Sequence, residues 1–184
     1  MILIKSGKIL RQAIACLFLC CLSSAVSAQP SPKNVQRLQL RDSMPSLSPR
    51  EAKWLNSLPS MPLVIKQYIA TTLPEMSLNW VENSDNPISV GNDNDFNKDG
   101  KRDVIVRIET RGTGGDLMFV FISQDDTFTI EYCDTNKGIK FLSNGFDSQV
   151  HGGRCNDVGS APCFQSHTWR GGRFIGGKFR RNPM

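Results

Sequence analysis

A short acidic loop at residues 93–103 constrains this chain more than any other stretch, because it leads directly into an apolar strand pattern at residues 104–109. Carboxylate and amide side chains recur at alternate positions, and Gly100 follows Asp99 to form a strong turn dipeptide. Calcium is a hard cation that takes roughly 6–8 oxygen ligands. A short loop can supply them if every second side chain turns inward and Gly100 adopts a positive φ angle. The spacing therefore predicts a calcium-type loop.

The loop departs from an EF-hand in two respects. An EF-hand places a bidentate Glu at loop position 12 and then enters a helix, whereas position 12 here is Val106 and the following residues alternate as in a strand. Residues 95–106 instead resemble the calcium loop of FG-GAP and VCBS-type repeats, in which a D-x-N-x-D-G-x-x-D loop leads into a β-strand. The resemblance implies that four residues supply side-chain oxygens to the ion, namely Asp95, Asn97, Asp99 and Asp103. It also implies that Lys101 supplies its backbone carbonyl.

A second interpretation of the loop is a polar surface turn in which Asx side chains bond to their own backbone. Three carboxylates this close in sequence repel one another in the absence of a cation. Lys98, Lys101 and Arg102 lie within the same loop and could offset that repulsion. Both interpretations stay open at this point.

The first 28 residues have the pattern of a secretory signal peptide, and residues 1–28 are assigned to it. An apolar run from Ala13 to Leu22 is too short to span a bilayer, and small residues precede a cleavage point before Gln29. Leu19 before Cys20 makes lipid anchoring the minor alternative. The basic residues of this segment are Lys5, Lys8 and Arg11. We expect an exported protein, periplasmic or secreted, with no membrane span after cleavage.

The remaining chain has the length of a single domain. Three of the 22 Lys and Arg residues and none of the 17 Asp and Glu residues lie in the signal segment, so the formal net charge falls from +5 to +2. Residues 154–184 carry several cations and one acid, Asp157, which is consistent with a solvated tail or with contact to an anionic surface or acidic partner. Export and the absence of interleaved aromatics argue against nucleic-acid binding.

Residues 29–47 are rich in Pro, Ser and Gln and are expected to form a flexible leader. Residues 48–184 are expected to form one α+β domain. Ser48 at the N-cap, Pro49 at N1 and Glu51 at N3 predict a helix to about residue 58. A second short helix is predicted over residues 63–73, ending before Pro74.

Several short strands follow the helices, and we expect one antiparallel meander of about five to seven strands with the helices packed on it. Alternation in the fourth predicted segment places Phe128, Ile130 and Tyr132 on one face. The chain ends with a strand, a Gly-Gly turn and a closing strand. The candidate segments for these strands are 76–81, 104–109, 117–123, 127–132, 140–142, 146–150, 164–170 and 173 onward.

Three cysteines remain after signal cleavage. Export favours oxidation, and Cys155 and Cys163 flank a short Gly/Pro/Ser-containing segment, so we expect them to form a disulfide and leave Cys133 unpaired. The same cysteines with His151 and His167 form a mirrored H-x3-C-x7-C-x3-H pattern that could hold zinc. Its spacing lacks the C-x2-C pair typical of zinc sites.

No catalytic constellation emerges from the sequence. We therefore predict an exported, non-enzymatic Ca²⁺-binding module that contacts an unknown protein or cell-surface partner. The alternative is a periplasmic inhibitor or immunity-type protein that blocks an enzyme through loop contacts without metal.

Overall fold

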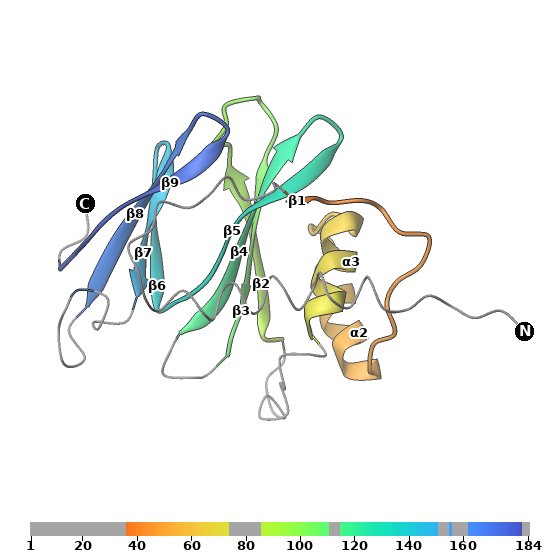
Figure 1. Cartoon of the computed structure of the whole chain (residues 1–184). Coiled ribbons are helices and arrows are strands. Elements are labelled where there is room, and N and C mark those ends of the chain that lie inside the picture. Colours follow the sequence, from red (N-terminus) through yellow and green to blue (C-terminus); the bar gives the residue numbers. More distant parts are fainter. Residues whose placement is uncertain (1–35, 74–85, 111–114, 151–154, 156–161, 182–184) are drawn as a thin grey trace, which may run out of the picture.

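The computed structural model describes residues 36–73, 86–110, 115–150, 155 and 162–181. Figure 1 shows a helix pair beside a five-stranded sheet, with a four-stranded sheet beyond it. The α+β class is thereby confirmed, but the prediction of a single sheet is wrong. The elements are β1 (Gln36–Arg37), α2 (Pro49–Asn56), α3 (Leu63–Thr72), β2 (Ile88–Asn94), β3 (Asp103–Ile108), β4 (Asp116–Gln124), β5 (Thr127–Asn136), β6 (Gly138–Leu142), β7 (Gly145–Val150), β8 (Cys163–Arg170) and β9 (Arg173–Arg180).

Both predicted helices are present. Ser48 caps α2 through a capping box with Glu51, and Pro49 occupies the first turn. Ile65 and Ile69 of α3 are fully buried, whereas Leu63 at the start of the helix is 54% exposed. The two helices cover one face of the five-stranded sheet and enclose the first hydrophobic core.

The five-stranded sheet has the order β1-β5-β4-β3-β2, and its strands β2 to β5 form the expected antiparallel meander. β4 is central, in agreement with its continuous apolar sequence. Val104 and Val106 of β3 face the first core, which lies between this sheet and the helices and is called the helix-side core below. Ile105 faces the second core, which lies between the two sheets. Alternation along β3 was therefore predicted correctly.

A β-bulge in β5 changes the predicted orientation of its side chains. Val120 pairs with Tyr132, but the next residue of β4, Phe121, pairs with Ile130, so Glu131 is an additional residue in β5. One extra residue moves the following side chains to the opposite face of the sheet. Phe128 and Ile130 consequently pack in the helix-side core, while Tyr132 packs between the sheets. The prediction that all three share a face is wrong.

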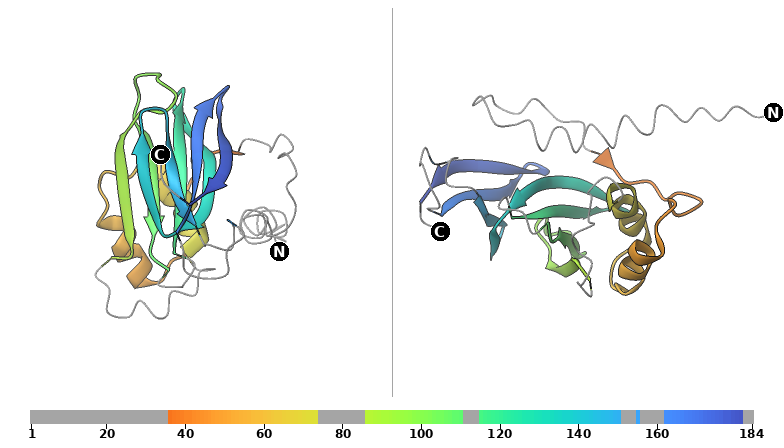
Figure 2. Two further views of the ribbon diagram at one scale, coloured as in Figure 1. Left: turned by 90° about the vertical axis from the view of Figure 1, so that its left-hand side faces the viewer. Right: turned by 90° about the horizontal axis from the view of Figure 1, so that it is seen from below.

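The four-stranded sheet has the order β6-β7-β8-β9 and packs against the face of the first sheet that the helices do not cover. Phe146 is fully buried at the centre of this second core, where its ring lies 5.1 Å from Phe174 and 4.9 Å from Tyr132. The predicted Gly-Gly turn joins β8 to β9, with φ values of 59° at Gly171 and 77° at Gly172. Figure 2 shows the two sheets and the helix pair from two further directions.

Part of the predicted flexible leader belongs to the folded domain. Gln36 and Arg37 form β1 on the edge of β5, and Leu38 is 6% exposed in the helix-side core. The Gln67 amide of α3 accepts a hydrogen bond from the Arg41 backbone N–H and donates one to the Arg41 carbonyl. The fold therefore begins upstream of Ser48, the predicted domain boundary.

Several predicted features lie outside the described residues: the signal peptide at 1–28, the leader at 29–35, the strand at 76–81 and His151. The strand that precedes the acidic loop in the structure is β2. Within the described ranges, no helix has the length and apolarity needed to cross a membrane.

Candidate metal centre

The acidic loop connects β2 to β3 at one end of the molecule, where the β4–β5 and β8–β9 turns also lie (Figure 1). Lys98 and Gly100 have φ values of 60° and 82°, so the chain bends sharply twice. The bend at Gly100 was predicted, because glycine adopts positive φ without a steric penalty. The bend at Lys98 was not, since a lysine gives no such signal.

Alternate side chains of the loop turn back toward its own backbone. The Asp95 carboxylate accepts hydrogen bonds from the N–H groups of Asp99 (3.1 Å) and Gly100 (3.0 Å). Asn97 Oδ1 also accepts from the Asp99 N–H at 3.3 Å, and Asp99 Oδ1 accepts from the Lys101 N–H at 2.8 Å. These Asx-type bonds hold three of the predicted ligands on a single turn.

Asp103 is fully buried and ties the loop to the centre of the sheet. Its Oδ2 accepts from the Phe96 N–H at 2.6 Å, and its Oδ1 accepts from the Ser123 N–H at 2.8 Å. The Asn97 side chain donates to the Ser123 carbonyl at 2.8 Å. Both backbone groups of Ser123, at the end of β4, are thus held by the loop, an arrangement that no local sequence signal indicated.

The buried surroundings of Asp103 are unfavourable to its ionised form. Burial raises the pKa of the Asp103 carboxyl from its usual 3.8 to about 6, and the nearby charges of Asp95 and Asp99 add to the rise. The hydrogen bonds from Phe96 and Ser123 oppose it. Three of the four predicted side-chain ligands therefore repel one another electrostatically.

Two nearby cations form ion pairs with carboxylates outside the predicted ligand set. The Lys101 ammonium donates to the Asp125 carbonyl and lies 3.8 Å from Asp126 in the β4–β5 turn. The Arg102 guanidinium lies 3.8 Å from Asp93. Lys101 and Arg102 are therefore engaged by carboxylates other than the predicted ligands.

Phe96 sits between two polar ligand positions but points into the second core. It is 3% exposed, and its ring lies 5.3 Å from Phe174 of β9 and 6.2 Å from Phe146 of β7. Because the Phe96 ring packs against β7 and β9, the acidic loop is connected directly to the four-stranded sheet.

In the part of the chain that the structure describes, no group of three or more His, Cys, Asp or Glu side chains is already arranged to hold a metal ion. Three of the predicted ligands, Asp95, Asn97 and Asp99, lie on one turn, and Asp103 follows at the start of β3. Calcium binding would require the oxygens of the predicted ligands to draw closer together.

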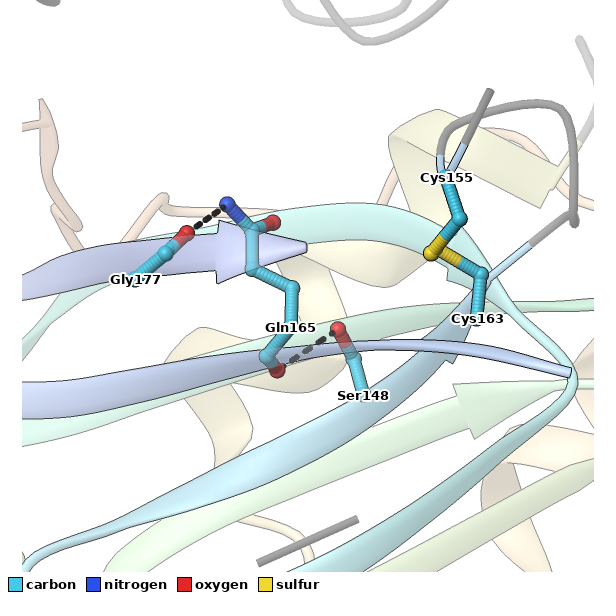
Figure 3. The surroundings of a disulfide bond; sticks show 5 residues. All are labelled: Ser148, Cys155, Cys163, Gln165 and Gly177. Carbon is cyan, nitrogen blue, oxygen red and sulfur yellow. Dashed lines mark hydrogen bonds between the residues drawn. A yellow bond between two sulfur atoms is a disulfide. The ribbon is translucent and has the colours of Figure 1, made fainter. Parts of the chain in front are cut away.

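The predicted disulfide is present. Cys155 and Cys163 are bonded, with their Cα atoms 5.8 Å apart, and the bond fastens the start of β8 (Figure 3). Both sulfurs are consumed, so the alternative zinc site lacks its thiolate ligands. Cys133 is not disulfide-bonded and packs against the helix-side core.

Comparison with known proteins gives no further assignment. No protein-family model, curated protein or solved structure matches this chain.

Proposed function

We propose that the loop at residues 95–103 binds Ca²⁺ and that the protein is an exported, non-enzymatic calcium-binding module that contacts a protein or cell-surface partner. The observation that carries the proposal is the concentration of mutually repelling carboxylates around one turn, with Asp103 buried among them. A divalent cation would reverse this electrostatic cost.

The donor set fits calcium in its chemistry. Asp95, Asn97, Asp99 and Asp103 offer carboxylate or amide oxygens, and Lys101 offers its backbone carbonyl. Each carboxylate oxygen that accepts one backbone hydrogen bond keeps a second acceptor site. The backbone N–H groups therefore orient the ligands without removing their capacity to bind, as outer-sphere hydrogen bonds do in metal sites.

The buried polar pair of the four-stranded sheet is not placed to act on a substrate in solution. Ser148 Oγ lies 3.0 Å from His167 Nε2, but Ser148 is fully buried and His167 is 8% exposed, so a substrate would have no direct access. Cys133 packs in the helix-side core, whereas His167 stacks on Phe146 of the second core. Cys133 and His167 therefore lie on opposite sides of the first sheet and do not form a nucleophile–base pair.

Isothermal titration calorimetry of the full chain, freed of metal with EDTA, tests calcium binding. We expect a dissociation constant on the order of 10⁻⁴–10⁻³ M, the range of extracellular calcium modules. Asp99→Asn removes one ligand charge but keeps an oxygen that can accept the Lys101 N–H, and it should weaken binding by about tenfold. Asp93→Asn removes an exposed carboxylate outside the ligand set and should leave the affinity unchanged.

The proposal would be contradicted if the folded wild-type chain gave no heat of calcium binding. It would also be contradicted if both substitutions weakened calcium affinity equally. The first outcome would favour the metal-free inhibitor alternative, in which the acidic turn is itself a contact surface.

A further inference from the structure

The last strand, β9, is an exposed edge of the four-stranded sheet. Ile175 is 41% exposed and Phe179 is 39% exposed, and Gly176 and Gly177 between them are also exposed. An exposed edge strand presents unpaired backbone groups that can accept another strand. The basic C-terminal region is therefore a sheet edge in the described structure and not merely a solvated tail.

The register shows which backbone groups of β9 point outward. Arg170 and Arg173 close the two-residue Gly-Gly turn, and such closing pairs exchange hydrogen bonds. Because bonded and non-bonded pairs alternate along an antiparallel ladder, the backbone groups of Phe174 and Gly176 face away from β8. The Gly177 carbonyl faces the other way and accepts from the Gln165 side chain at 2.9 Å (Figure 3).

A pocket of about 220 Å³ lies beside this edge, lined by Thr168, Arg170, Ile175, Gly176 and Gly177. The two glycines leave its wall without side chains. Gly177 has room for a Cβ atom, which would lie 3.6 Å from the nearest neighbour, the Ser166 carbonyl oxygen. The edge therefore combines outward backbone groups with an open hollow on the adjoining face of the β8–β9 hairpin.

The β8–β9 segment itself carries charge of a single sign. Residues 162–181 contain five cations and no Asp or Glu. Arg180 is bonded to the buried Asp147 at 2.6 Å. Exposed cations remain along the β8–β9 hairpin at Arg170, Arg173 and Lys178.

We propose that the β9 edge binds an extended acidic segment of a partner protein by β-strand addition. The partner backbone pairs with Phe174 and Gly176, one of its apolar side chains enters the pocket, and its carboxylates meet Arg170, Arg173 and Lys178. A second copy of this chain is disfavoured as the occupant, because two basic β9 edges would repel each other. Lysine on an edge also deters aggregation, but this explains neither the pocket nor the exposed Ile175 and Phe179.

The test uses a fluorescein-labelled ten-residue peptide of alternating glutamate and valine, titrated with the full chain and followed by fluorescence polarisation. All titrations contain EDTA, so the result does not depend on calcium binding at the acidic loop. We expect saturable binding below about 1 mM. The same peptide, N-methylated at alternate amides, should bind about tenfold more weakly, because it cannot pair with the edge.

Charge reversal on the protein supplies the matched comparison. Arg173→Glu with Lys178→Glu should weaken peptide binding by about tenfold. Lys53→Glu with Lys66→Glu changes the net charge equally on the two helices and should leave binding within about twofold.

Four results would overturn the proposal: no saturable binding, equal binding of the N-methylated peptide, equal weakening by the two charge reversals, or tighter binding to phosphatidylglycerol vesicles than to the peptide. The last would identify an anionic membrane surface as the target.

Discussion

Asp103 is a fully buried carboxylate whose two oxygens accept backbone hydrogen bonds from separate elements, the acidic loop and the end of β4. The sequence spacing identified Asp103 as the ninth loop position but could not reveal this structural role. Its partner Ser123 lies twenty residues away and carries no turn or ligand signal. Local spacing predicts which side chains share a turn, whereas the partners of a buried side chain depend on tertiary packing.

Replacing Asp103 with alanine should lower the free energy of unfolding by about 2–4 kcal/mol, because the N–H groups of Phe96 and Ser123 would lose their acceptors inside the protein. The exposed Asp93 is the control, and Asp93→Ala should change stability by less than about 0.5 kcal/mol. Urea unfolding in EDTA at neutral pH measures both. A loss below about 1 kcal/mol for Asp103→Ala would contradict the proposed anchoring role.

The raised pKa of Asp103 gives stability a definite pH dependence without calcium. A carboxyl whose pKa is higher in the folded than in the unfolded state binds protons more tightly when folded, so its contribution is full below about pH 4 and declines as pH rises to about 6. The shift corresponds to about 2–3 kcal/mol. Burial also raises the pKa of Glu131, which contributes with the same sign.

Urea unfolding in EDTA at a series of pH values checks this dependence. Asp103→Asn should remove most of the decline between pH 4 and 6, while Glu131→Gln serves as the comparison and should leave the larger part in place. An unchanged decline in Asp103→Asn would show that Asp103 does not cause it.

At the scale of elements, the sequence predicts most helices and strands because their signals are local. Ser48, Pro49 and Glu51 predict the start of α2, and the Gly-Gly pair predicts the β8–β9 turn. The bulge at Glu131 escapes prediction, since alternation of apolar residues appears uninterrupted through Tyr132. β2 escapes for a different reason, because most of its sequence is polar.

Phe96 links the acidic loop to the four-stranded sheet and should be the loop residue that contributes most through packing. Phe96→Ala should destabilise the protein by about 3–5 kcal/mol, because it leaves a cavity beside Phe146 and Phe174. Phe141, which is 44% exposed, is the matched control, and Phe141→Ala should cost about 1 kcal/mol or less. Thermal unfolding followed by circular dichroism distinguishes the two, and equal losses would contradict the packing role of Phe96.

At the scale of the whole molecule, the sequence indicates the α+β class but not the division of its strands between two sheets. Both sheets are antiparallel with neighbouring strands joined in sequence, so a list of strands is compatible with either arrangement. What separates the sheets is the second core, in which Tyr132, Phe146 and Phe174 meet from β5, β7 and β9. These long-range contacts have no local sequence signature.

The leader illustrates the same limit. Its composition predicts flexibility, yet Leu38 contributes to the helix-side core and Arg41 is bonded through its backbone to Gln67. A single apolar residue among polar neighbours, such as Leu38, becomes part of the core when another element provides an apolar surface for it.

The calcium proposal is tested most directly by the melting temperature of the full chain in EDTA and in about 10 mM calcium chloride. A dissociation constant on the order of 10⁻⁴–10⁻³ M predicts a gain of about 1.4–2.7 kcal/mol and a rise in melting temperature of about 3–10 °C. Asp95→Asn combined with Asp99→Asn should abolish the rise, and magnesium at equal concentration should reproduce little of it. A rise of less than about 1 °C in the wild-type chain, or an equal rise in the double variant, would contradict calcium binding at this loop.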